Sequence, residues 1–162
     1  MQRFAAGAYL FRQGDRDPNV HWLVNGYMKA TYVSPEGRAS VKSLLAPGAF
    51  VGSLTALDTD GSASFDLRAQ TECEVRTIAY AELRELAARD HATATAMVDF
   101  LLGFARRKER REFELLCLAA PQRYAEALKA LADFDDVFSQ ADIAAYIGIT
   151  PQALSRLKRR RQ

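Results

Sequence analysis

The sequence predicts an α+β protein, with a β-rich first half of jelly-roll, sandwich or barrel type and a helical second half. Short apolar segments separated by turn signals fill residues 1–80. Residues 81–118 contain no proline and one glycine, and they are rich in Ala, Leu, Glu and Arg, which favour helix. The 162-residue chain holds one moderate domain, or a β module joined to a small helical one.

Strands are expected in the apolar segments, which cover residues 8–11, 21–24, 27–33, 41–45, 65–69 and 75–78. The turn signals between them are Gln13-Gly14-Asp15, Asn25-Gly26, Pro35-Glu36-Gly37 and Pro47-Gly48. Asn25-Gly26 predicts a tight hairpin, because both residue types tolerate a positive φ. Four large side chains of this half are assigned to the core: Tyr32, Phe50, Phe65 and Leu67.

Helical structure is expected across residues 81–118, and Pro121 is expected to open a further helix over residues 122–131. An apolar stripe at helical spacing suits a partner helix and comprises Val98, Leu101, Leu102 and Ala105. The run of mixed charges at residues 106–112 predicts a solvated helix face.

The cysteines and histidines of this sequence do not indicate a disulfide, a metal site or a catalytic centre. Cys73 and Cys117 lie far apart in apolar surroundings, so we expect reduced core thiols, without a disulfide or metal site. His21 has no second ligand at metal spacing, which favours a half-buried strand histidine over a haem or metal ligand. We therefore expect no catalytic residue, metal or cofactor.

The bulk composition excludes a membrane protein. No apolar run approaches the ~20 residues that span a bilayer, and Met1 begins no signal peptide. The expected location is the cytoplasm, with no membrane partner.

Two short helices joined by a tight turn are predicted within residues 139–162. Ser139 is a good N-cap, and Asp142 makes a variant of the capping box. Gly148 ends the first helix, where a positive φ is needed. Thr150 caps the second helix and Pro151 fits its first turn. The apolar residues that join these helices are Ile143, Ala144, Ile147, Ile149, Leu154 and Leu157.

The second of these helices carries a polar stripe, formed by Gln152, Ser155, Arg156 and Arg159 at spacings i, i+3, i+4 and i+7. Arg pairs with guanine, Gln pairs with adenine, and Ser is permissive. Residues 139–162 hold five basic residues against one acid, +4 in total, so the rest of this +2 chain sums to −2. Arg160 and the helix start at Thr150 suit DNA phosphates, which favours a DNA-binding unit over a generic helical hairpin.

These motifs resemble the Crp/Fnr (cyclic-AMP receptor / fumarate–nitrate regulator) superfamily over nearly the whole chain. The terminal motifs are S-Q-A-D-I-A (139–144) and G-I-T-P-Q-A-L-S-R (148–156). The β motifs are L-F-R-Q-G-D (10–15), W-L-V-N-G (22–26) and P-G-A-F-V-G (47–52). The resemblance implies a cyclic-nucleotide-binding-like β-roll at 1–90, a dimerisation helix at 91–118 and a helix-turn-helix DNA-binding domain at 119–162.

The same resemblance implies the partners. A homodimer would place two reading helices about 34 Å apart on a pseudo-palindromic site in double-stranded DNA. Gln152, Ser155 and Arg156 would read bases, and Gln152 stands where many relatives have Glu, so the half-site should differ. RNA polymerase is a further candidate partner of such a regulator.

The pocket that binds nucleotide in relatives is degenerate here. Gly52 is followed by Ser53, where nucleotide-binding members place Glu, and Ala63 precedes Ser64, where they place Arg. A buried phosphate without that cation costs several kcal/mol, so we expect an unidentified small-molecule effector or none, and no cyclic nucleotide. The four-cysteine set of iron–sulfur relatives is also absent.

An alternative function stays open. The family often has a helix before the roll and a β wing after the reading helix, and this sequence shows neither. A late start or a shortened family branch would both explain this. The missing wing and the degenerate pocket motivate a sensor module that binds a ligand or protein and has lost DNA binding.

Overall fold

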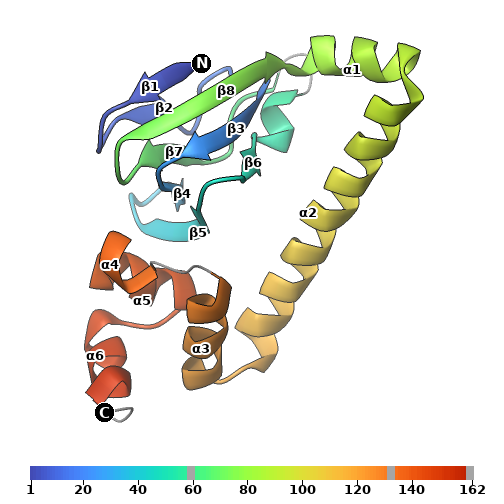
Figure 1. Cartoon of the computed structure of the whole chain (residues 1–162). Coiled ribbons are helices and arrows are strands. Elements are labelled where there is room, and N and C mark those ends of the chain that lie inside the picture. Colours follow the sequence, from blue (N-terminus) through green and yellow to red (C-terminus); the bar gives the residue numbers. More distant parts are fainter. Residues whose placement is uncertain (58–60, 131–133, 160–162) are drawn as a thin grey trace.

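The computed structural model describes residues 1–57, 61–130 and 134–159 (Figure 1). Its N-terminal part is a roll of two four-stranded antiparallel sheets, with orders β1-β8-β3-β6 and β2-β7-β4-β5. The strands are β1 (Gln2–Phe4), β2 (Tyr9–Phe11), β3 (Asn19–Asn25), β4 (Met28–Val33), β5 (Ala39–Leu45), β6 (Phe50–Val51), β7 (Asp66–Ala69) and β8 (Cys73–Ala79). A short 3₁₀ helix, η1 (Leu54–Leu57), follows β6. Strands were predicted at six of these places, whereas β1 and β6 were missed.

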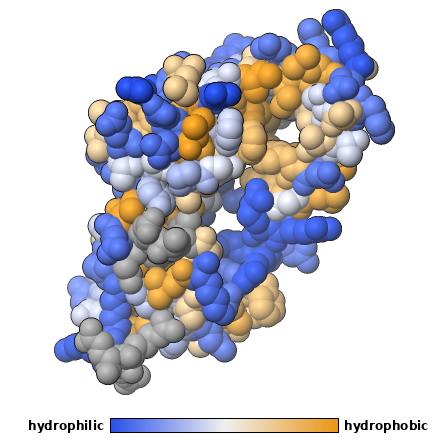
Figure 2. All heavy atoms as spheres, in the orientation of Figure 1, coloured by the Kyte–Doolittle hydropathy of each residue, from blue (hydrophilic) through white to orange (hydrophobic). Residues whose placement is uncertain are grey.

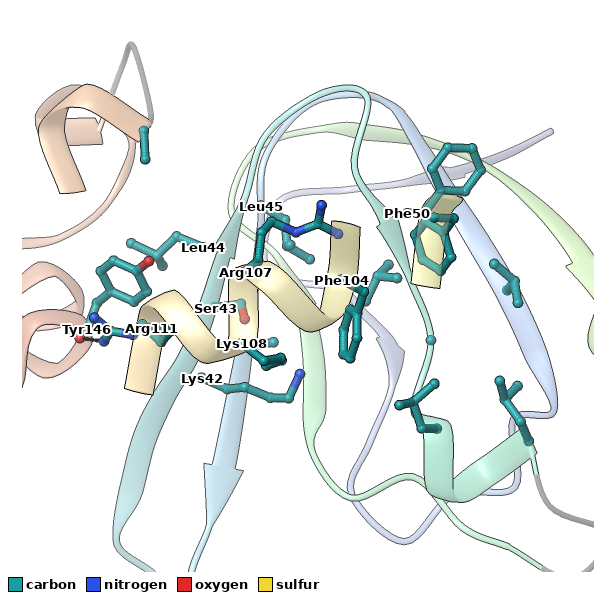
Figure 3. A pocket seen from close by; sticks show the side chains of 18 residues that line it. Lys42, Ser43, Leu44, Leu45, Phe50, Phe104, Arg107, Lys108, Arg111 and Tyr146 are labelled. Atoms are coloured by element: carbon teal, nitrogen blue, oxygen red, sulfur yellow. Dashed lines mark hydrogen bonds between the residues drawn. The ribbon is translucent and has the colours of Figure 1, made fainter. Parts of the chain in front are cut away.

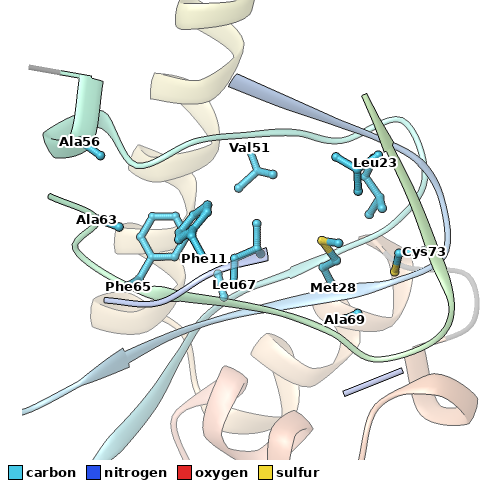
Figure 4. Packing of buried hydrophobic residues seen from close by; sticks show 12 residues of the cluster. Phe11, Leu23, Met28, Val51, Ala56, Ala63, Phe65, Leu67, Ala69 and Cys73 are labelled. Atoms are coloured by element: carbon cyan, nitrogen blue, oxygen red, sulfur yellow. The ribbon is translucent and has the colours of Figure 1, made fainter. Parts of the chain in front are cut away.

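The core of the roll lies between the two sheets (Figure 4). Phe65 and Leu67 are buried there, as predicted, and Phe11 packs edge-on against Phe65. The core assignments of Tyr32 and Phe50 were wrong, because these side chains are 43% and 48% exposed.

Asn25-Gly26 does not form the predicted hairpin. β3 pairs with β8 and β6, and β4 belongs to the other sheet, so this turn carries the chain across the roll. Gly26 has φ +84°, and an added Cβ would lie 2.2 Å from the carbonyl oxygen of Glu72. The hairpin lies one turn later, where β4 pairs directly with β5.

His21 is 4% exposed, and so it is buried more completely than predicted. Its Nε2 shares a 2.7 Å hydrogen bond with Asp17, and its Nδ1 shares one of 2.9 Å with Thr77. Burial alone would raise the pKa of Asp17, but hydrogen bonds from His21 and Asn19 hold that pKa below its usual value. These partners give His21 a structural role in closing this end of the roll.

The helices follow the roll: α1 (Tyr80–Arg89), α2 (His91–Cys117), α3 (Ala120–Ala130), α4 (Phe134–Val137), α5 (Gln140–Ile147) and α6 (Pro151–Arg159). Asp90 separates α1 from α2, and its carboxylate accepts a hydrogen bond from the backbone N–H of Thr93. In the described parts of the chain, no helix has the length and apolar character needed to cross a membrane.

The long helix α2 buries none of its side chains completely. Figure 2 shows apolar surface over its upper and lower parts, separated by hydrophilic surface. The exposed apolar side chains are Val98, Leu101, Leu102, Phe113, Leu115 and Leu116. Cys117 is also exposed, so its assignment to the core was wrong, whereas Cys73 is buried. The charged run 106–112 is only partly solvated, because Lys108 and Arg111 are half-buried.

Candidate nucleic-acid interface

The turn between α5 and α6 has the predicted local geometry. Ser139 caps α5, and its Oγ accepts a hydrogen bond from the backbone N–H of Asp142 at 3.1 Å. Gly148 ends that helix in the left-handed region, with φ +72°. Thr150 Oγ1 accepts from the N–H of Ala153 at 3.2 Å and caps α6. The chain therefore reverses within three residues and starts α6 in a fixed direction.

One face of α6 is packed into the protein. Leu154 is completely buried against Ile143 and Ile147 of α5 in a second hydrophobic cluster. Leu157 and Ile149 are partly buried at its edge. The same cluster includes Leu44 of β5, so the roll packs against the terminal helices. Because this apolar face is fixed, the opposite face of α6 points outward.

The predicted polar stripe lies on that outward face. Its four members are exposed: Gln152, Ser155, Arg156 and Arg159. Thr150 is exposed at the start of the helix, and Arg160 lies outside the described residues. The structure gives one contact within the stripe, a 3.4 Å hydrogen bond from Arg156 Nε to the carbonyl oxygen of Gln152. The stripe can therefore offer guanidinium, amide and hydroxyl groups to an external partner.

Two arginines that sequence reasoning missed hold the end of α5. Arg123 Nε donates to the carbonyl oxygen of Ile147 at 2.6 Å, and its Nη1 donates to that of Leu118 at 2.7 Å. Arg111 of α2 donates to the carbonyl oxygen of Tyr146 and lies over its ring, 4.0 Å from the centroid. Cations stabilise the negative end of a helix dipole. Both contacts join distant segments, so no local pattern signals them.

Three of the four residues of the predicted effector pocket, Ser53, Ala63 and Ser64, lie together and form no open site. Ser53 is 1% exposed, and its Oγ accepts from the backbone N–H of Ser64 at 3.0 Å. The Oγ atoms of Ser53 and Ser64 are 3.3 Å apart, within hydrogen-bond distance. Ala63 is buried in the core of the roll. Gly52 lines a cavity that these three residues do not reach.

Comparison with known proteins identifies relatives along the whole chain. Residues 1–90 match the family described as "Cyclic nucleotide-binding domain". The cAMP-activated global transcriptional regulator Vfr of Pseudomonas aeruginosa is 28% identical over 159 residues, which cover 96% of this chain and 74% of Vfr. The corresponding regulator CRP of Escherichia coli is 25% identical over 160 residues, with 97% and 74% covered.

A similar arrangement occurs in a solved structure, that of FixK2 from Bradyrhizobium japonicum. It superposes with a TM-score of 0.83 at 20% identity, covering 98% of this chain and 82% of FixK2. Fold and similarity together define a protein with a β-roll of the cyclic nucleotide-binding domain family followed by a helical part. The chain belongs to the cyclic nucleotide-binding domain family and, within it, to the Crp/Fnr superfamily of transcription regulators.

Proposed function

We propose that this regulator binds double-stranded DNA as a homodimer and reads a pseudo-palindromic operator with α6. The observation that carries this proposal is the exposed stripe of Gln152, Ser155, Arg156 and Arg159 opposite the buried Leu154. The base-reading residues are Gln152, Ser155 and Arg156, and the residues on phosphates are Thr150, Arg159 and Arg160. Such a regulator acts in the cytoplasm, with RNA polymerase as a candidate partner.

In this proposal, residues 1–90 form the sensory roll, 91–118 the dimerisation helix and 119–162 the DNA-binding domain. The exposed apolar side chains of α2 support the dimer, because a long helix with such a stripe gains stability by burying it against a second copy. Two reading helices would then lie about 34 Å apart, one DNA turn.

Selection from random duplex DNA at low salt tests DNA binding and gives the half-site. We expect a two-fold related motif, and Arg156→Ala should cost about 1–3 kcal/mol with relaxed choice at one base position. Arg84→Ala removes an exposed arginine of α1 and serves as the matched control. Failure to enrich any motif would favour the sensor module without DNA binding, and an equal loss on every sequence after Arg156→Ala would refute base reading.

Analytical ultracentrifugation tests the dimer. Leu102→Glu puts a charge in the apolar stripe and should yield a monomer, because a buried unpaired carboxylate is costly. Ala88→Glu adds the same charge at an exposed position of α1 and should leave the dimer intact. A dimer that persists in Leu102→Glu would contradict the role of this stripe.

Vfr and CRP are described as cAMP-activated, but the absence of Glu at Ser53 and of Arg at Ala63 supports a different effector. The Ser53 hydroxyl is already bonded to Ser64, and Ala63 stands where nucleotide-binding members place arginine. Calorimetric titration with cyclic AMP and cyclic GMP should give no binding, and micromolar affinity would refute the loss of this pocket.

A further inference from the structure

A cavity of about 280 Å³ lies between the roll and α2 and adjoins the closed Ser53–Ser64 region, because Gly52 and Leu54 line it (Figure 3). Its walls are largely apolar and include Phe50, Leu44 and Leu45 from the roll and Phe104 from α2. Basic side chains line the same space: Lys42 from β5, and Arg107, Lys108 and Arg111 from α2. The cavity therefore combines apolar walls with a concentration of positive charge.

Lys42 and Lys108 are half-buried and lie beside each other. Burial, together with the charge of Lys108, lowers the pKa of Lys42 to about 7. Aromatic rings give partial compensation, because Lys42 Nζ lies 4.1 Å from the ring centroid of Phe65 and Lys108 Nζ lies 5.4 Å from that of Phe104. Two like charges held together in this way are unfavourable unless an anion joins them.

The chain supplies no such anion within its described parts. There, the structure gives no ion pair with a carboxylate for Lys42, Arg107 or Lys108. Arg111 also lines the cavity, but it contacts Glu114, and its neighbour Arg110 contacts Glu114 and Glu126. The positive charge of Lys42, Arg107 and Lys108 is therefore left in the cavity for an external ligand.

We propose that this cavity binds an organic carboxylate with an apolar body. The carboxylate lies between Lys42 and Lys108, and the body packs against Phe50 and Phe104. Charge-assisted hydrogen bonds to ammonium groups hold the anionic head, and the apolar walls favour a body without sugar or phosphate groups. The site uses none of Ser53, Ala63 and Ser64, which do not line the cavity.

The ligand would also reach the element that precedes the reading helix. Tyr146 of α5 forms part of the same wall, beside Arg111 of α2. A bound carboxylate therefore links β5, α2 and α5. This consequence rests on the proposed DNA-binding function, whereas binding itself does not require it.

Isothermal titration calorimetry of the full chain, with no DNA present, tests the site. The probes are 2-naphthoate and its neutral counterpart 2-naphthylmethanol. We expect 2-naphthoate to bind at least about tenfold more tightly, because one charge-assisted hydrogen bond contributes a factor of this order. Lys42→Gln and Lys108→Gln should each weaken 2-naphthoate about tenfold or more and leave the neutral alcohol unchanged.

Arg38→Gln is the matched control, since it removes an exposed cation from the turn that precedes β5. It should bind 2-naphthoate as the unaltered protein does. Thermal melting shows whether each variant is folded, and loss of a repelling lysine should not lower the melting temperature.

Three results would overturn the proposal: equal affinity for the acid and the alcohol, unchanged affinity in both lysine variants, or tighter binding of cyclic AMP than of 2-naphthoate. Inorganic phosphate that competes as well as 2-naphthoate would also overturn it, because an anion site alone would then suffice. The outcome of the DNA selection does not depend on these titrations, so a failure of carboxylate binding can be told apart from a failure of DNA binding.

Discussion

Lys29 of β4 and Asp142 of α5 form an ion pair with an Nζ–Oδ1 distance of 2.5 Å, which joins the roll to the terminal helices. Their side chains are 18% and 16% exposed, so water screens the pair weakly. Lys29→Met should lower the free energy of unfolding by about 1–3 kcal/mol, because Asp142 loses a charged hydrogen-bond partner. Urea denaturation measures this loss.

The Arg3–Glu74 pair is the control for that measurement. Its distance is 2.9 Å, but Arg3 is 69% exposed, so Arg3→Met should cost about 1 kcal/mol or less. Equal losses in the two variants would contradict a special contribution of the Lys29–Asp142 contact. A double-mutant cycle with Asp142→Asn separates the pair from other effects of each substitution.

Gln152→Glu should change the base that α6 prefers. Glutamine pairs with adenine, whereas a glutamate accepts a hydrogen bond from cytosine N4, and such contacts discriminate by about 1–3 kcal/mol. Selection from random duplexes should therefore show one position per half-site changing from adenine to cytosine. Gln140→Glu adds the same charge at an exposed position of α5 and should leave the preferred sequence unaltered. A motif unchanged by Gln152→Glu would exclude Gln152 from base reading.

Gly148→Ala should destabilise the protein by about 1–2 kcal/mol, because φ of +72° is unfavourable for a residue with a Cβ. The nearest atom to an added Cβ is Leu115 Cδ2 at 3.5 Å, so the cost comes from the backbone and not from a clash. Gly148→Asn should be milder, because asparagine tolerates this region. Chemical denaturation of both variants measures the difference.

Gly103→Ala should have the opposite effect on stability and serves as the control. Gly103 lies inside α2, where an added Cβ meets only the end of the Arg107 side chain at 3.4 Å. Alanine at this helical position should stabilise by up to about 1 kcal/mol. Stabilisation by Gly148→Ala would contradict the left-handed turn.

Because of Lys42, the stability of the folded chain should rise with pH. Its pKa is lowered to about 7 in the folded chain, against about 10.4 when unfolded. Below pH 7 Lys42 is protonated in both the folded and the unfolded state, and the folded state carries the full cost of burying this charge. Between pH 7 and about 10 the unfolded state binds more protons, so stability rises with pH.

Lys42→Gln should therefore melt at a higher temperature than the unaltered protein at pH 6, by roughly 2–4 °C for each kcal/mol relieved. The difference should shrink as the pH approaches 10. Lys108 of α2 acts directly on Lys42, and the other charged or titratable side chains that line the same cavity are Arg107 and Arg111 of α2 and Tyr146 of α5. Scanning calorimetry across this range checks the trend, and a difference independent of pH would contradict the lowered pKa.

Local patterns predicted six of the eight described strands and the α5–α6 turn because those elements depend on neighbouring residues. Ser139, Gly148 and Thr150 act on atoms within five residues of themselves, so spacing alone was sufficient. The Asn25-Gly26 turn was misassigned because strand pairing is decided by the partner strands β8 and β6. The contacts of Arg111 and Arg123 with the end of α5 span 35 and 24 residues, and only the folded chain brings them together.

The exposed aromatic residues were misassigned for a related reason. Alternation along a strand predicts which residues share a face, but it does not say whether α2 covers that face. Phe50 contacts Phe100 of α2, and Tyr32 lies at the rim of the roll core with its ring edge-on to Phe65. Hydrophobicity alone therefore identified apolar residues without distinguishing the inner core from the surface beside the long helix.

Trp22 is the chain's single tryptophan and stacks on Phe50, with 6.0 Å between ring centroids and 13° between ring planes. Phe50 in turn forms one wall of the cavity beside α2. Selective excitation of tryptophan in the unlabelled protein therefore gives emission from one indole, which stacks on that wall. Movement of α2 relative to the roll would change the wavelength or the intensity of this emission, so Trp22 fluorescence reports on conformational changes beside the cavity.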